Sequence, residues 1–196
     1  AIEPFQGKKK SLEENIYLEY GNSGGEKSTE FEKATTNLLK ELGFSESLWI
    51  GSKKSQKNWR GNFPDVFIKR DDSMNCGLAD TKATSIFSLG HADMLKMKET
   101  YFYTHKEIDS SSVLRYFLYI AGGFKGNINL SVDQLSKQTQ IPVTAMDAKT
   151  MLLLKKLKEK GWEAKDIEND IFMSGGFISA DAIESLQNKT TSKERN

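Results

Sequence analysis

The sequence predicts an α/β domain in which a mixed central β-sheet is flanked by helices. Two observations carry this prediction: an amphipathic helix precedes a candidate β-hairpin, and helices and strands alternate along the rest of the chain. The composition agrees, because 196 residues with 37% hydrophobic and 28% charged side chains are typical of a globular domain. A chain of this length buries roughly 70% of its unfolded surface, so a core can form without disulfides.

The first part of the chain predicts two helices separated by a break. Residues 11–20 carry a weak helical pattern, and a glycine-rich run follows it. A stronger helix is predicted over 29–42 from apolar residues at helical spacing. Thr29 and Glu32 form a candidate capping box at its start, and Gly43 lies where a C-terminal cap is expected.

A β-hairpin is predicted after a polar, loop-like stretch over 44–62. Residues 64–69 are rich in β-forming side chains, and a proline suits the first position of a strand. Residues 76–83 alternate around small apolar side chains. The polar run 70–75 between them suits an antiparallel turn, so the two strands are expected to pair.

The remaining strands and helices follow in alternation. Strands are predicted over 115–121 and 141–146, where apolar and β-forming residues gather. The predicted helices cover about 89–104, 131–139, 148–160, 163–172 and 179–186. All but the one over 163–172 have a residue suited to the helix start, namely Ser88, Ser131, Asp147 and Ser179 in that order.

These elements divide the chain into three parts. Residues 1–25 are expected to be an extension or linker with a weak helix, residues 26–187 the functional domain, and residues 188–196 a disordered tail. The first residue is not methionine, so we expect a fragment or a processed chain.

Composition excludes several classes of site. A single cysteine excludes an internal disulfide framework and a cysteine zinc cluster, and two histidines exclude a metal site of three imidazoles. No run approaches the roughly 18 apolar residues of a membrane span, and the start does not have the pattern of a signal peptide. We therefore expect a cytoplasmic location and no membrane contact. The net charge of +1 says little about partners.

Two acids and a lysine in the candidate hairpin point to chemistry. Asp65 begins the first strand, and Asp80 and Lys82 lie on the second, with residues 66–79 between the two acids. A hairpin of this length can bring both carboxyls to one region, and residues two apart on a strand project from the same face. Paired carboxylates repel each other, and a magnesium ion relieves that repulsion.

This arrangement fits hydrolysis of a phosphodiester. The oxygen ligands would come from Asp65, Asp80 and the Thr81 backbone carbonyl, while the ion polarises the phosphate and activates a water. Lys82 would orient or help deprotonate that water and offset the charge of the transition state. The same residues also occur by chance at the end of a surface hairpin, and that alternative stays open on spacing alone.

At this point the sequence resembles a family. Asp65 and Asp80-Thr81-Lys82 match the PD-(D/E)xK nuclease signature, and the likeness is closest to the cleavage domain of type IIS restriction endonucleases of the FokI kind. Further matches occur in order: Leu42-Gly43-Phe44, Gly90-His91-Ala92-Asp93-Met94, and Phe117 to Asn127, which ends in Phe124-Lys125-Gly126-Asn127. They cover Phe31 to about Leu186.

The resemblance implies a Mg²⁺-dependent endonuclease domain of the restriction-endonuclease-like fold. Such a domain cuts double-stranded DNA without reading its sequence, uses one or two Mg²⁺ ions, and depends on a separate recognition domain or subunit. Two copies would pair, as a homodimer or transiently, so that each cuts one strand. The expected setting is a restriction-modification system in the bacterial cytoplasm.

Further residues receive weaker assignments. Glu32 would lie near a second metal or serve only as a cap. His91 would hydrogen-bond near the scissile phosphate or cap its helix, and Lys125 would contact phosphate or remain a solvated turn lysine. Asp93 matches an acidic pairing position of the family, but Met97 replaces its partner arginine. A basic, tryptophan-flanked loop would either hold DNA phosphate or be solvated loop charge; it contains Lys53, Lys54, Lys57 and Arg60. A further set would form a dimer surface or pack in the core: Met94, Met97 and Tyr101.

Two other functions stay open. The chain could be a catalytically silent DNA-binding or dimer-partner module of the same fold, although such a module has no need of the costly acid cluster. It could instead be a repair or transposon nuclease, in which the two motifs beginning at Gly90 and at Phe124 would not be expected.

Overall fold

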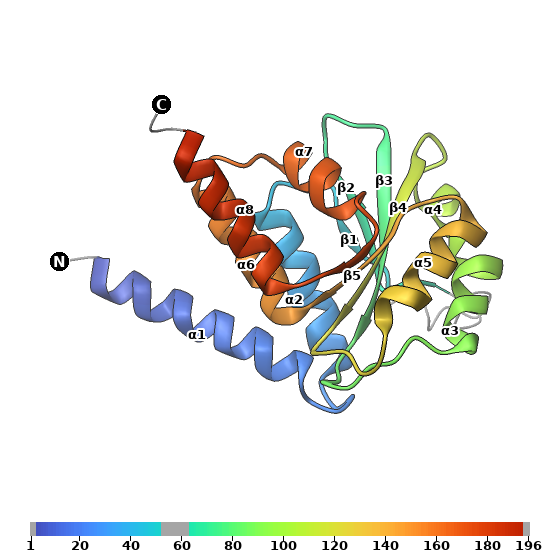
Figure 1. Ribbon diagram of the computed structural model, residues 1–196, viewed down its shortest axis with the longest axis horizontal. Coiled ribbons are helices and arrows are strands. Elements are labelled where there is room, and N and C mark those ends of the chain that lie inside the picture. Colours follow the sequence, from blue (N-terminus) through green and yellow to red (C-terminus); the bar gives the residue numbers. More distant parts are fainter. Residues whose placement is uncertain (1–2, 52–62, 194–196) are drawn as a thin grey trace.

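The computed structural model describes residues 3–51 and 63–193. Its centre is a six-stranded sheet whose strands follow one another in chain order (Figure 1). The first, second and third strands pair antiparallel, and the third to sixth strands pair parallel. The strands are β1 (Leu48–Trp49), β2 (Val66–Lys69), β3 (Asn75–Lys82), β4 (Val113–Ala121), β5 (Val143–Asp147) and β6 (Gly176–Ile178).

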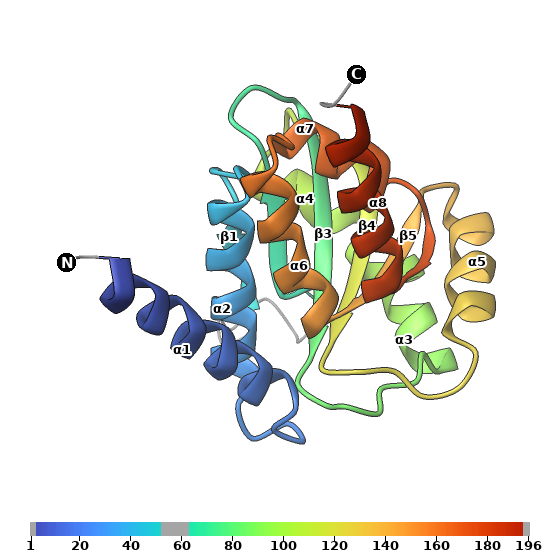
Figure 2. The ribbon, with the colours of Figure 1, turned by 60° about the vertical axis from the view of Figure 1, so that its left-hand side comes forward.

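Helices cover both faces of the sheet, so the predicted α/β class and mixed sheet are confirmed. Figures 1 and 2 show α1, α2, α6 and α8 on one side and α3, α4 and α5 on the other. The first layer comprises α1 (Glu3–Gly21), α2 (Ser28–Glu41), α6 (Ala148–Glu159), α7 (Ala164–Ile167), the π-helical η3 (Glu168–Phe172) and α8 (Ala180–Lys193). The second comprises α3 (His91–Lys96), the π-helical η2 (Met97–Tyr101), α4 (Phe102–Ile108) and α5 (Ile128–Thr139).

Alternation along the strands divides the buried side chains into two cores. On β2, Val66 and Ile68 pack beneath the first helical layer, whereas Phe67 packs beneath the second. β4 is buried on both faces over most of its length, as expected for a central strand between parallel neighbours. The two cores therefore cover opposite faces of the sheet, and the site described below lies at one end of the β2–β3 pair.

Several predicted helix boundaries are confirmed by their caps. The Asp147 side chain accepts a hydrogen bond from the Thr150 N–H at 2.7 Å and starts α6. Gly43 follows the end of α2 with φ of +104°, where a residue with a Cβ would be strained.

Three predicted caps are wrong. Within the described residues, no side chain caps α2, so Thr29 and Glu32 do not form the expected capping box. Helix α3 begins at Gly90, whose N–H donates to Asp93 Oδ2, instead of at Ser88. Helix α5 begins at Asn127, whose side chain accepts from the Leu130 N–H, instead of at Ser131.

Several elements exceed or break the predicted ranges. Helix α1 starts at Glu3 and α8 continues to Lys193, beyond the predicted ends at 11 and 186. The short strands β1 and β6 were not expected. The helix predicted over 89–104 runs on to Ile108 and contains the π-helical turn η2.

The π-helical turn directs Met97 and Tyr101 into the core. Both side chains are almost fully buried, and the Tyr101 ring stacks on Phe117 with centroids 6.0 Å apart. Of the two roles left open by the sequence, core packing is therefore the one that the structure gives to Met97 and Tyr101. Their assignment to a dimer surface is corrected accordingly.

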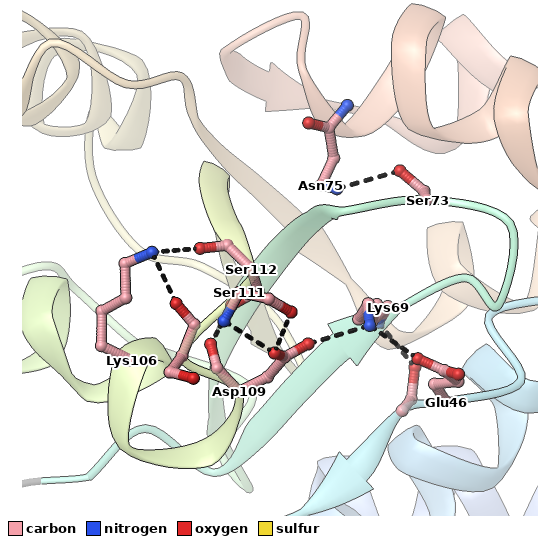
Figure 3. Close-up of polar contacts among 10 residues, drawn as sticks. Glu46, Lys69, Ser73, Asn75, Lys106, Asp109, Ser111 and Ser112 are labelled. Atoms are coloured by element: carbon pink, nitrogen blue, oxygen red, sulfur yellow. Dashed lines mark hydrogen bonds and ion pairs between the residues drawn. The ribbon is translucent and has the colours of Figure 1, made fainter.

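A polar network closes the end of the sheet that is remote from the β2–β3 acids (Figure 3). Lys69, the last residue of β2, forms ion pairs of 2.8 Å with both Glu46 and Asp109. Asp109 also accepts hydrogen bonds from the N–H and hydroxyl of Ser111. These contacts tie the α2–β1 and α4–β4 connections to β2, and they lower the pKa of the Asp109 carboxyl, chiefly through Lys69.

Across the described ranges, no helix has both the length and the apolar character needed to cross a membrane.

Candidate active site in the β2–β3 hairpin

The two predicted metal-binding acids lie side by side at one end of the hairpin. Val66, the first residue of β2, pairs with Ala79 in antiparallel register, so Asp65 and Asp80 directly flank the last pair at this end. The Asp65 N–H donates to the Ala79 carbonyl at 2.9 Å, which holds Asp65 against β3. Both acid side chains are buried, with exposed fractions of 2% and 3%. The hairpin therefore brings the acids together as the sequence predicts.

Neighbouring strands hold Asp65 from both sides. Its Oδ2 accepts hydrogen bonds from the Thr81 N–H at 2.7 Å and the Thr81 hydroxyl at 3.0 Å. Its backbone carbonyl accepts from the N–H groups of Ile50 and Gly51 at 2.9 and 3.2 Å. An extended residue directs its N–H and C=O to the same side, so the Thr81 carbonyl also lies on the side of β3 that faces Asp65.

Lys82 brings its ammonium to the same point. Its Nζ lies 2.8 Å from Asp80 Oδ2 and 3.8 Å from Asp93 Oδ1. The ammonium also lies 5.6 Å from the centre of the Phe87 ring. Asp80 and Lys82 are two residues apart on β3, which accounts for their shared face.

The electrostatics of the site are dominated by burial and by the two acids. Burial, and after it the neighbouring Asp65 carboxylate, raise the pKa of the Asp80 carboxyl to about 7. Burial acts to lower the pKa of the Lys82 ammonium, but the Asp80, Asp65 and Asp93 carboxylates outweigh it and raise that pKa. The site therefore concentrates negative charge, and Lys82 is a cation at neutral pH.

A cavity of about 530 Å³ opens over these groups. The side chains and backbone that surround it belong to Gly24, Gly25, Ser28, Glu32, Asp65, Asp80, Thr81, Lys82, Ala83, Thr84, Lys96 and Tyr101.

Glu32 reaches this cavity from α2. Its Oε2 accepts a hydrogen bond from the Trp49 indole N–H at 2.7 Å, and its side chain is 8% exposed. A Cβ at Gly51 would collide with the same carboxylate, so a larger residue there would have to displace the Glu32 side chain. Lys33 lies 4.4 Å from the centre of the Trp49 ring and covers its other side. Glu32 is thus a positioned cavity residue, and its cap role is excluded.

The donor set fits a hard divalent cation. Among the described residues, no three His, Cys, Asp or Glu side chains form a ready-made metal cluster. Two neighbouring buried acids nevertheless line the open cavity, and the raised pKa of Asp80 reflects burial and the nearby Asp65 carboxylate, which a cation would relieve. Carboxylate oxygens completed by a carbonyl and water are the ligands that Mg²⁺ prefers.

The remaining predicted residues lie outside this cavity or outside the described ranges. His91 is exposed at the start of α3 and Lys125 is exposed in the turn after β4; within the described residues, neither lines the cavity. Met94 is partly buried against the second core. Asp93 faces Lys82. The basic set Lys53, Lys54, Lys57 and Arg60 lies outside the described residues.

Sequence reasoning missed two contributors. Lys96 lines the cavity, and it lies one helical turn beyond Asp93, a spacing that places both on one side of α3. Trp49 orients Glu32. The apolar run around Trp49 was a usable signal for a short strand, but its contact with α2 depends on the fold.

The comparisons with known proteins identify the family of this chain. A family model described as the FokI cleavage domain matches residues 7–178. The chain belongs to the FokI cleavage-domain family. This membership makes it a nuclease cleavage module with a restriction-endonuclease-like fold. None of the curated proteins compared with the chain matches it.

Solved structures share the fold of this FokI-type domain. The restriction endonuclease FokI superimposes with a TM-score of 0.66 at 18% identity, over 83% of this chain and 30% of FokI. FokI bound to DNA gives a TM-score of 0.63 at 18% identity, over 85% and 30%. The small subunit R.BspD6I2 of the heterodimeric restriction endonuclease R.BspD6I gives 0.54 at 13% identity, over 93% and 98%. The chain thus spans about 30% of the length of FokI.

Proposed function

We propose that this chain is a Mg²⁺-dependent endonuclease domain that hydrolyses phosphodiester bonds in double-stranded DNA. The observation that carries the proposal is that Asp65 and Asp80 are both buried at the same end of the β2–β3 pair, with the Lys82 ammonium 2.8 Å from Asp80. Membership of the FokI cleavage-domain family supports the same chemistry.

Each residue has a distinct role in this proposal. Asp65, Asp80 and the Thr81 carbonyl would hold the cation, and Glu32 would complete its surroundings. When bound, the cation supplies a Lewis acid for the phosphate and a water of lowered pKa. Lys82 binds a phosphate oxygen and offsets the charge that develops in the transition state, because its ammonium is protonated at neutral pH. Lys96 adds a second cation at the wall of the cavity.

We further propose a type IIS arrangement in which another domain or subunit reads the DNA sequence. The support is that this chain corresponds to 30% of FokI, and that a second structural neighbour is one subunit of a heterodimeric restriction endonuclease. In this arrangement, two cleavage modules come together as a homodimer or transiently, so that both strands are cut. A bacterial cytoplasm is the expected location.

Plasmid cleavage tests the catalytic proposal. The protein is incubated with supercoiled plasmid in Mg²⁺, and conversion to nicked and linear DNA is followed on gels. We expect cleavage with Mg²⁺ and none with EDTA.

Three variants identify the site. Asp65→Asn and Lys82→Met should each lower the cleavage rate at least about 100-fold, because each removes a group that acts on the reacting phosphate or its cation. The matched control is Lys149→Met, which removes an exposed lysine on α6. Wild-type cleavage in EDTA would contradict the metal requirement, and cleavage at the wild-type rate by Lys82→Met would contradict the assigned site.

A further inference from the structure

We infer that Asp93 is a positioning residue that anchors the Lys82 ammonium in the cleavage site. The inference rests on the proposed nuclease function. It gives Asp93 a role within its own chain, different from the pairing role that its place in the sequence suggests.

The carboxylate of Asp93 is engaged at both oxygens. Oδ1 lies 3.8 Å from Lys82 Nζ, and Oδ2 accepts the Gly90 N–H at 3.3 Å at the start of α3. The Asp93 carbonyl accepts a hydrogen bond from the Tyr119 hydroxyl at 3.4 Å, which ties this turn of α3 to the central strand β4. The carboxylate is therefore held by the fold and directed at the hairpin.

Lys82 needs an anchor other than Asp80. In the structure its closest anion is Asp80 Oδ2, at 2.8 Å. A divalent cation on Asp80 would compete with the ammonium for the same carboxylate, because both are attracted to it and repel each other. Asp93 is the second carboxylate in contact with the ammonium among the described residues, and it stands on a different element. Phe87 borders the ammonium on a further side and narrows the positions open to it.

The structure does not favour the alternative role of Asp93, in which its carboxylate pairs with a second copy of the chain. A pairing acid must present its carboxylate to another molecule, but the Asp93 side chain is only 26% exposed and faces Lys82 and Gly90. The position that matches the partner arginine of the family is Met97, four residues further, which is buried and uncharged. An interchain pair of the kind implied by the resemblance therefore has no basic partner at that position.

Asp93→Asn is the informative variant. The amide oxygen can still accept the Gly90 N–H and keep the helix cap, while the charge that faces Lys82 is removed. Asp93→Glu retains the charge and can also cap at this position. Glu99→Gln, an exposed acid on the same helical segment, is the matched control.

Cleavage is measured in single turnovers with duplex DNA varied to saturation. We expect Asp93→Asn to lower the saturated rate about 10- to 100-fold, as loss of a group that orients an active-site residue does, with DNA affinity changed less than about twofold. Asp93→Glu should recover part of the rate, and Glu99→Gln should match the wild type. An unchanged saturated rate in Asp93→Asn overturns the inference.

Two measurements without metal or DNA make the test independent of activity. In lysine-labelled protein, the ¹⁵Nζ resonance of Lys82, assigned by its loss in Lys82→Met, should shift in Asp93→Asn and not in Glu99→Gln. Sedimentation equilibrium should give the same association constant for wild type and Asp93→Asn. Weaker association would return Asp93 to a pairing role, and an unmoved Lys82 resonance would show that the two side chains do not interact.

These readouts distinguish failure of the proposed nuclease function from failure of the proposed role of Asp93. If the wild type fails to cut DNA, the proposed function fails, while the Lys82 resonance still decides whether Asp93 contacts Lys82. If the wild type cuts and Asp93→Asn cuts equally well, the nuclease proposal stands and the role of Asp93 is refuted.

Discussion

We expect the Asp80 carboxylate to destabilise the metal-free fold and to be required for cleavage. It is buried beside Asp65, and its raised pKa means that folding disfavours its charged form. We expect Asp80→Asn to raise the melting temperature of the metal-free protein at pH 8, because the neutral amide removes the repulsion. The same variant should lower Mg²⁺-dependent cleavage at least about 100-fold.

Calorimetry and plasmid cleavage on the same preparation check this prediction. Asp71→Asn is the control, because it removes an exposed acid from the β2–β3 turn. A lower melting temperature for Asp80→Asn, with the control unchanged, would mean that Asp80 stabilises the metal-free fold and that its burial has been misjudged.

We expect Glu32 to lower the Mg²⁺ concentration that cleavage requires. Its carboxylate is held at the cavity by Trp49, and Gly51 leaves it room. We expect Glu32→Gln to raise the Mg²⁺ concentration needed for half-maximal cleavage about 10-fold or more, since one anionic oxygen near the cation is lost. Magnesium titrations of the cleavage rate measure this shift, with the exposed Glu30→Gln as control on the same helix. Identical titrations would remove Glu32 from the site.

At the residue scale, the sequence predicted the chemistry of the site better than its surroundings. Asp65, Asp80 and Lys82 could be found because strand period and hairpin register are local properties. Glu32 was assigned two roles, and the choice between them depended on Trp49, whose contact with α2 is made by tertiary packing. Lys96 was missed because a lysine on a helix is usually solvated, and only the fold places this one at the cavity.

Among the elements, α6 offers the cleanest test of a local prediction. Asp147 ends β5 and caps α6 by accepting the Thr150 N–H at 2.7 Å. Asp147→Ala should lower the free energy of unfolding by about 1 kcal/mol, because an N–H at the helix start loses its acceptor. Asp147→Asn keeps an acceptor and should lose much less.

Urea unfolding followed by circular dichroism measures both α6 variants. Equal losses for alanine and asparagine would show that Asp147 acts through its charge, as an anion near the helix N-terminus, instead of through the hydrogen bond.

The elements that the sequence missed share a physical cause. β6 is short, begins with a glycine and is held partly by the Phe177 N–H bond to the Asn129 side chain, a partner remote in sequence. The π-helical turn η2 has no composition signal, because it results from packing Met97 and Tyr101 into the second core. By contrast, α2 and α6 were predicted to within a residue or two at each end.

At the scale of the whole molecule, the acid pair links stability to pH. The folded state holds the Asp80 proton up to about pH 7, whereas an ordinary aspartate releases it near 3.8. Between these values the folded state binds more protons than the unfolded state, so stability contributed by this group falls as pH rises and then levels off. We expect the melting temperature of the metal-free protein to decrease across this interval relative to Asp80→Asn.

Magnesium should reverse that loss. A cation that binds the ionised pair stabilises only the folded state, so the Mg²⁺-induced rise in melting temperature should be larger at pH 8 than at pH 5.5. Thermal melts in EDTA and in Mg²⁺ at the two pH values provide the measurement. A rise that is equal at both pH values, or one that persists in Asp80→Asn, would place the cation elsewhere.

The antiparallel pairing of β2 and β3 has a consequence for comparing and re-engineering such domains. The turn that joins the strands lies at the far end from Asp65 and Asp80, so its length has no part in aligning them. We therefore expect that a longer or shorter turn leaves the two acids aligned, so the interval between them in the sequence need not be fixed among such domains. For the same reason, a peptide tag inserted between the exposed residues Asp71 and Asp72 should report on the protein without silencing it.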